Sequence, residues 1–274
     1  MNNIYELLLK ERKIKYKGGL YHQTQINFAY NSNKIEGCEL TEDQTRYLYE
    51  THSIKFDGDV FVRTDDIIST DNHFYLFNYM LDTASEELSE SMIKRYHEIL
   101  MTGTEESKEE NFAVGAYKRE PNMIGLFTET TSPENVSEEI GELLKRYNAK
   151  GKIDFNDIID FHYLFESIHP FQNGNGRVGR IIMFKECLRN NILPFVISNQ
   201  YKRFYSLGLS EYEKSSYRLI ETCAASQDDY ARLCQYFRID ISDMERSLPK
   251  KLQKQTQEDV VCPDEEEQST HRRR

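Results

Sequence analysis

HPFQNGNGRVGR, residues His169–Arg180, joins two apolar-rich segments that both have helical periodicity. Gly174 and Gly176 allow the backbone to turn tightly and to bring its N–H groups close to a ligand. These N–H groups lie where a predicted helix begins, and a helix N-terminus attracts anions. Arg177 and Arg180 are three residues apart, so both guanidinium groups share one helical face and can bind phosphate oxygens. The stretch therefore predicts a cradle for a di- or triphosphate.

A histidine stands immediately before this cradle. His169 can reach the edge of a bound phosphate, and an unperturbed histidine has a pKa of about 6.5, which suits a general base near neutral pH. The other histidines have no comparable anion site beside them in the sequence, and we interpret them as structural or surface residues.

Two other nucleotide-binding patterns are excluded. Residues 174–179 formally match GxGxxG, but a dinucleotide fold needs a strand before the glycines and an acidic residue about twenty positions later. Here a predicted helix precedes them, and 195–203 contains neither Asp nor Glu. The chain also has no GxxxxGK[ST] sequence, which excludes a P-loop.

Apolar periodicity predicts helices along most of the chain. The segment 154–168 carries a broad apolar stripe, and a further helix starts near Arg177. Gly37 is suited to end a helix at 22–36, and Thr41–Gln44 is a capping box that opens the next helix. Residues 111–130 mix turn residues with β-formers, which predicts a hairpin. Further helices are expected at 72–85, 89–101, 202–222 and 228–247. One more is expected after the hairpin, with Ser132 as its N-cap, Pro133 as its first residue and its end near Lys150. The predicted fold class is all-α with one small β-hairpin.

Composition narrows the classes of partner. The 274 residues carry a formal charge of −11, which argues against general nucleic-acid binding because that requires a basic face. No apolar run approaches membrane-spanning length, and the N-terminal residues resemble neither a signal nor a transit peptide. The five cysteines form no CxxC pair, so neither a disulfide framework nor a zinc site is indicated. We expect a cytoplasmic protein with reduced thiols that binds neither nucleic acid nor membrane.

The stretch at 169–180 resembles the signature HxFx[DE]GNGRxxR of the Fic (filamentation induced by cAMP) family, and every defining position but one agrees. The likeness in helix order and hairpin placement extends over roughly residues 60–240. The resemblance implies a Fic-type helical bundle with a β-hairpin flap. It also implies protein AMPylation, in which a Tyr, Ser or Thr hydroxyl of a target protein attacks the α-phosphate of ATP and pyrophosphate leaves.

The resemblance also implies a role for each matching residue. His169 would deprotonate the target hydroxyl, and Phe171 would anchor the loop in the core. The hairpin would clamp the target segment by strand pairing, a common mode of peptide capture. The remaining implied residues are Gly174 and Gly176 as anion-binding N–H donors, Asn175 as a loop support that touches phosphate, Arg177 and Arg180 as ligands of the β- and γ-phosphates, and Met123, Ile124 and Gly125 in the flap.

Asn173 is the departure from the signature. The family has Asp or Glu there, and that carboxylate holds Mg²⁺. The amide oxygen of Asn173 can bind a hard cation but brings no negative charge, so we expect Mg²⁺ binding to be weakened. An Asn173→Asp change is then expected to raise Mg²⁺-dependent AMPylation. Asn173 also leaves two alternatives open: a different phosphate-containing donor, or a catalytically weak regulatory module that binds nucleotide.

The segment Ser32–Gly37, SNKIEG, matches the family's inhibitory pattern [ST]xxxE[GN]. The resemblance implies that Glu36 pairs with Arg180 and displaces the γ-phosphate, and helical spacing places Ser32 and Glu36 on one face. The same pattern recurs at 130–135, but Pro133 makes that copy a better helix start. The alternative is that Glu36 is a solvent-facing residue near a helix C-terminus.

These features divide the chain into an N-terminal helical region (1–60) with the inhibitory pattern, a Fic core (61–248) and a charged, flexible tail (249–274). The leading prediction is an autoinhibited protein adenylyltransferase. A second prediction for the same site is removal of AMP from a modified protein, with Glu36 orienting a water molecule. The target is unidentified, the chain's own tyrosines are candidate targets, and a homo-oligomer is an open alternative to a monomer.

Overall fold

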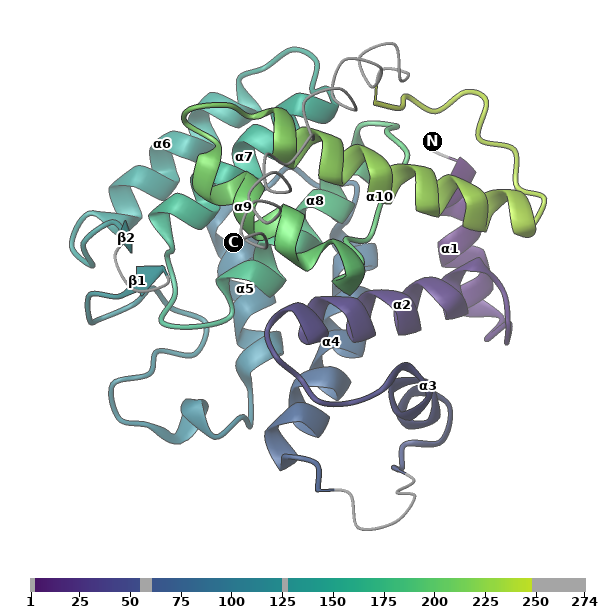
Figure 1. Ribbon diagram of the computed structural model, residues 1–274, viewed down its shortest axis with the longest axis horizontal. Coiled ribbons are helices and arrows are strands. Elements are labelled where there is room, and N and C mark those ends of the chain that lie inside the picture. Colours follow the sequence, from purple (N-terminus) through teal and green to yellow (C-terminus); the bar gives the residue numbers. More distant parts are fainter. Residues whose placement is uncertain (1–2, 55–60, 125–127, 248–274) are drawn as a thin grey trace, which may run out of the picture.

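Figure 1 shows the computed structural model of the chain, in which residues 3–54, 61–124 and 128–247 are described. These residues form ten α-helices, two short 3-10 turns and one two-stranded sheet, which confirms the predicted all-α class. In chain order the elements are α1 (Asn3–Lys13), α2 (Leu20–Ile35), α3 (Glu42–Thr51), α4 (Thr64–Thr83), α5 (Glu90–Met101), η1 (Glu106–Lys108), β1 (Met123–Ile124), β2 (Thr128–Glu129), α6 (Val136–Asn148), α7 (Phe155–Ile168), α8 (Asn175–Arg189), η2 (Asn199–Tyr201), α9 (Lys202–Glu211) and α10 (Tyr217–Tyr236).

Helix α8 lies in the interior of the fold. In Figure 1 it runs through the middle of the ribbon, and it contacts α2, α4, α5 and α7. Every side chain from Arg177 to Leu188 is buried, including the ion pair between Lys185 and Glu186 at 2.6 Å. A helix that is enclosed on all sides is a core helix rather than an amphipathic surface helix. Its N-terminus therefore holds a fixed position, with the His169–Arg180 stretch at that end.

Helix α2 contains most of the Ser32–Gly37 pattern and lies next to α8. It contacts α1, α3, α4 and α8, and it ends at Ile35 with Glu36 as its C-cap. Gly37 follows with a φ of +95°, a conformation that favours glycine after a helix. One continuous apolar cluster extends from Ile4 to Met244, so residues of α1 and α2 share a core with those of α7 and α8. Residues 249–274 of the expected tail lie outside the described residues.

The predicted hairpin is present. Met123 pairs with Glu129 and Ile124 with Thr128 in antiparallel register. The side chains of Met123 and Ile124 are 57% and 38% exposed, so this strand offers an apolar surface to solvent. Gly125, expected at the tip of the flap, lies outside the described residues.

Several expected helix limits are wrong. The helices expected at 202–222 and 228–247 are instead α9 and α10, and α10 passes through the expected break near 223–227. The helix can continue through this stretch because Ser226 donates to the carbonyl of Thr222 and Gln227 to that of Leu193, so both polar side chains are satisfied while buried. Two further differences remain: α4 begins at Thr64, not near 72, and α1 lies in the region expected to be helical although no limits were given for it.

The expected start of the helix after the hairpin is also wrong. Ser132 is not its N-cap and Pro133 is not its first residue, because α6 begins at Val136. The N–H of Asn135 bonds the carbonyl of Ser132, which forms a turn ahead of the helix. None of the helices in the described ranges combines the length and the apolar character that a membrane crossing needs.

Candidate active site at the N-terminus of α8

The loop between α7 and α8 is fixed by its own side chains. Asn175 accepts from the N–H of Phe171 at 2.8 Å and donates to the carbonyl of Phe171 at 2.8 Å. The ring of Phe171 is fully buried and stacks on His97, with 3.9 Å between ring centroids. His97 in turn bonds the carbonyl of Asn173 at 3.2 Å. The loop therefore has a rigid support, which a preorganised site requires.

Two glycines permit close approach at this loop. Gly174 has a φ of +81° and precedes α8, and a side chain there would meet the sulfur of Met101 at 3.1 Å. A Cβ at Gly176 would meet Glu36 Oε1 at 2.6 Å and Arg180 Nη1 at 2.9 Å. The N–H groups of a first helical turn have no partner within the helix, so a ligand in this position can reach them.

Arg177 lies in this first turn with its charge only weakly compensated. Its Nη2 contacts the sulfur of Met101 at 3.7 Å, and its buried Nε has no hydrogen-bond partner. Burial lowers the pKa of Arg177, although Glu36 opposes that effect. A buried guanidinium with an unsatisfied donor is costly unless an anion binds it. Arg177 therefore favours occupation of the cradle by a phosphate.

Arg180, by contrast, forms hydrogen bonds with the C-terminal end of α2. Its Nε donates to Ser32 Oγ at 3.0 Å, and its Nη2 donates to the carbonyl of Ser32 at 2.9 Å and to Glu36 Oε1 at 2.6 Å. Burial disfavours the charge on Glu36, but Arg180 and then Arg177 outweigh it and hold the Glu36 pKa below its usual value. The structure thus places Ser32 and Glu36 in contact with Arg180, which follows them by more than 140 residues in the sequence.

His169 lies at the C-terminal end of α7 in a left-handed conformation. Its Nδ1 lies 3.2 Å from the carbonyl of Glu166, and burial lowers the pKa of His169 to about 4. Since a carbonyl only accepts, Nδ1 carries the proton and Nε2 is left with a free lone pair. At neutral pH the imidazole is uncharged, so Nε2 can accept a proton.

Asn173 does not present a free ligand. Its Oδ1 accepts from the N–H of Gly174 at 2.6 Å, and its Nδ2 donates to both carboxylate oxygens of Glu106, at 2.6 and 2.7 Å. Sequence reasoning missed Glu106, because it lies in a 3-10 turn 67 residues earlier and no motif marks it. A carboxylate therefore does stand at this end of the loop, although the loop itself does not supply it.

Lys118 was also missed. Its Nζ donates to Asn122 Oδ1 at 2.7 Å and to Thr130 Oγ1 at 2.6 Å, on either side of the hairpin. The backbone N–H of Lys118 bonds the carbonyl of Pro170, and Asn122 bonds that of Phe171. Burial lowers the pKa of Lys118 to about 8. This lysine ties the hairpin to the loop that carries His169.

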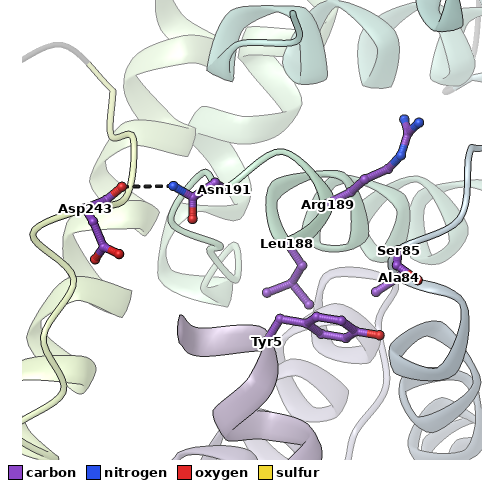
Figure 2. Close-up of a pocket in the computed structure, with 7 residues that line it drawn as sticks. All are labelled: Tyr5, Ala84, Ser85, Leu188, Arg189, Asn191 and Asp243. Carbon is purple, nitrogen blue, oxygen red and sulfur yellow. Dashed lines mark hydrogen bonds between the residues drawn. The ribbon is translucent and has the colours of Figure 1, made fainter. Parts of the chain in front are cut away.

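A separate cavity of about 430 Å³ lies at the other end of α8 (Figure 2). Leu188 and Arg189 line it from the last turn of the helix, and Asn191 bonds the carbonyl of Asp243 beside it. Arg189 is already paired with Glu186 at 3.6 Å. Since α8 is 15 residues long, about 20 Å separates this cavity from the loop. It contains no cluster of catalytic groups among its lining residues, and the candidate site remains the loop.

Comparison with known proteins agrees with this geometry. Residues 87–187 match the model of the Fic/DOC family. This part of the chain is similar to the Fic/DOC family. The matched Fic region covers α5 to α8 and includes the His169–Arg180 loop and the hairpin, whereas α2 with Glu36 lies outside it.

Curated relatives and solved structures extend the match. The chain is 27% identical over 206 residues to the "Probable protein adenylyltransferase aq_aa38" of Aquifex aeolicus, covering 71% of this chain and 62% of the relative. It is 24% identical over 194 residues to protein adenylyltransferase fic-1 of Caenorhabditis elegans, covering 69% and 37%. The chain thus spans less than two thirds of either relative. A Fic domain containing signaling protein from Bacteroides thetaiotaomicron has the same fold, with a TM-score of 0.70 at 20% identity over 88% of this chain and 99% of that one.

Proposed function

We propose that this protein is an adenylyltransferase that transfers AMP from ATP to a Tyr, Ser or Thr hydroxyl of a target protein. The observation that carries the proposal is the pairing of an uncharged His169 with a buried, unsatisfied Arg177 on one rigid loop. The base and the anion site lie at the two ends of the six-residue connection between α7 and α8, and transfer of AMP needs both kinds of group. The relatives named as protein adenylyltransferases support the same reaction.

The reaction follows from the roles of these groups. The target hydroxyl oxygen bonds to the α-phosphorus of ATP while the bond from that phosphorus to the α–β bridging oxygen breaks. The hydroxyl proton passes to Nε2 of His169, and pyrophosphate leaves with the bridging oxygen. Arg177 and the N–H groups of the first turn of α8 bind the phosphates, and Asn175 keeps the loop in shape for them. Positioning and charge stabilisation supply most of the catalysis in phosphoryl transfer.

Mg²⁺ belongs to this proposal as the ion that accompanies ATP. Bound to the phosphates, it would neutralise part of their charge. The amide of Asn173 is bonded at both ends within the protein and does not fit the ion by itself. The carboxylate of Glu106 beside it has the oxygen donors that Mg²⁺ prefers.

In the resting state Glu36 would hold this enzyme back. Arg180 would serve the γ-phosphate, but its Nη2 is bonded to Glu36 and to Ser32. A carboxylate competes directly with a phosphate for a guanidinium. ATP would therefore bind with its outer phosphate displaced, or would have to move Glu36 aside first.

The hairpin would receive the target segment. Its exposed strand Met123–Ile124 offers backbone groups and apolar side chains for an added strand. Lys118 joins the hairpin to the carbonyl of Pro170, next to His169. A hydroxyl on the added strand would in this way be delivered close to the base.

The test is incubation of the purified protein with Mg²⁺ and ATP labelled on the α-phosphate, followed by detection of label on protein. Transfer is expected to the chain itself or to a protein of the source cell, stronger with Glu36→Gly and absent with His169→Ala. Label from γ-labelled ATP instead would indicate phosphorylation and contradict the proposal. Nucleotide binding without any transfer would favour a regulatory module.

A second activity of the same site is removal of AMP from a modified protein. The observation that favours it is the position of Glu36, whose Oε1 lies against Gly176 at the cradle and could orient a water molecule. The two activities respond oppositely to Glu36→Gly. Loss of label from a pre-modified target that requires Glu36 would support removal of AMP, whereas transfer that increases without Glu36 would support addition.

A further inference from the structure

Glu106 is held at the candidate active site by a specific contact. Asn173 Nδ2 lies within hydrogen-bond distance of both of its carboxylate oxygens, at 2.6 and 2.7 Å. Its neighbour Glu105 instead pairs with Lys108 at 2.7 Å on the surface. Of these two adjacent carboxylates, only Glu106 contacts the loop through Asn173. Glu106 is half-buried, and its charge acts on the buried Arg177.

This placement creates an electrostatic conflict with ATP. A triphosphate bound by Arg177 and the first turn of α8 brings several negative charges close to Glu106. Like charges at short range in a partly buried site repel strongly. A cation between the carboxylate and the phosphates turns this repulsion into attraction on both sides. Hard divalent cations bind in this way, through one or two carboxylates and the phosphates of the substrate.

We propose that Glu106, oriented by Asn173, is the carboxylate that binds a divalent cation together with the phosphates of ATP. The proposal rests on the function proposed above. Within the described residues no group of three or more His, Cys, Asp or Glu side chains could hold a metal ion alone, so the phosphates must complete the coordination. Asn173 is then a positioning residue: its amide fixes Glu106 and, through Oδ1, the N–H of Gly174.

The proposal changes what Asn173→Asp is expected to do. Alone, it would set two carboxylates against each other where an amide now donates two hydrogen bonds. Combined with Glu106→Gln, it would return the carboxylate to the loop and restore the amide–carboxylate pair with the partners exchanged. The double variant is therefore a rescue experiment.

The experiment measures the gain in nucleotide affinity that the metal provides. An ATP analogue with a methylene group between the α- and β-phosphates, which cannot be cleaved there, is titrated by calorimetry with Mg²⁺ or with EDTA. All chains carry Glu36→Gly to free Arg180. The ratio of the two affinities is compared among Glu106→Gln, Glu106→Ala, the matched surface control Glu105→Gln and the double variant. Thermal melting establishes that each is folded, and Glu106→Gln keeps an acceptor for Asn173.

Glu106→Gln and Glu106→Ala are expected to lower the Mg²⁺ gain roughly tenfold, the usual scale for losing a group that holds or supports a metal. Glu105→Gln should leave it unchanged, and the double variant should recover it. An equal Mg²⁺ gain in all chains would overturn the proposal. So would a Glu106→Gln chain that binds more tightly by the same factor with and without Mg²⁺, because Glu106 would then only repel nucleotide. Absence of analogue binding in every chain would overturn the proposed function as well.

Discussion

Arg180 and Glu36, 144 positions apart, form an ion pair at 2.6 Å in which the guanidinium side chain is 3% exposed and the carboxylate side chain 37% exposed. Arg180 is thus buried in the core, whereas Glu36 lies at the C-terminal end of α2 in partial contact with solvent. Ser32 adds a hydroxyl and a carbonyl to the same guanidinium. Because only Glu36 can leave without disturbing the core, it is the movable half of the contact.

The first prediction concerns this movable half. Glu36→Gln keeps the shape of the side chain and removes its charge, so it weakens competition with the γ-phosphate. The amide oxygen can still accept from Arg180, so only part of the about 1.5–3 kcal/mol of a hydrogen bond between charged groups is lost, and the rate of label transfer is expected to rise roughly tenfold at most. Label transfer from α-labelled ATP measures the effect. Glu39→Gln, three residues later and exposed, is the matched control; equal rates in the two variants would exclude an inhibitory role for Glu36.

Lys118 carries the second prediction. Lys118→Met keeps the length and apolar body of the side chain but removes its bonds to Asn122 and Thr130. The hairpin should then lose its fixed position relative to His169, which raises KM for a protein target several-fold while ATP affinity stays the same. Steady-state kinetics with a target peptide and ATP calorimetry separate the two effects. The exposed Lys108→Met serves as the control, and a fall in ATP affinity with no change in KM for the target would contradict this role.

The third prediction is a loss of stability in acid to which His97 contributes. This side chain is fully buried, and burial lowers its pKa to about 3. The unfolded chain takes up a proton near pH 6.5 and the folded chain does not, so stability is complete above that pH and falls as the pH drops toward 3. Between pH 6.5 and 5 the loss is about 2 kcal/mol for this one group.

Urea unfolding at several pH values measures this slope. His97→Gln should reduce it but not abolish it, because burial also lowers the pKa values of His73 and His162 to about 3. The exposed His52→Gln should leave the slope unchanged. His97→Gln should also lower the overall stability, because Nδ1 accepts from the N–H of Gly115 at 3.0 Å and the ring stacks on Phe171. A slope in His97→Gln equal to that of the native chain would place the acid sensitivity elsewhere.

The parts of this site that could be predicted are formed by residues that lie close together in the sequence. The proposed cradle of Gly174, Gly176 and Arg177 lies within four positions, so local rules for helix N-termini and anions were sufficient to propose it. The all-α class followed from apolar periodicity, and the hairpin from its turn residues and β-formers. These are short-range signals, and the structure confirms the all-α class and the hairpin.

Contacts between distant segments explain what was missed. Glu106 and Lys118 reach the loop from 67 and about 50 positions away, and only the folded core brings them there. Gly179 shows the same limit: it formally completed a GxGxxG pattern, but a Cβ there would meet Glu166 and His162 of α7 within 2.7 Å. Its function is close packing between two helices, which a single sequence does not distinguish from phosphate binding.

The last prediction concerns Glu166, a buried residue of α7 that is close enough to Arg180 for the guanidinium to affect its pKa. Burial raises its pKa to about 8 despite the nearby guanidinium, so the carboxyl is protonated at neutral pH in the folded chain. Its stabilising contribution is complete below the unfolded pKa of about 4.5 and is lost as the pH rises through 8, a slope opposite to that of His97. Glu166→Gln reproduces the protonated form and should flatten the decline between about pH 4.5 and 8 in urea unfolding. If the variant declines as steeply as the native chain, Glu166 is ionised in the fold, and Arg180 is then shared by two carboxylates instead of being held by Glu36 alone.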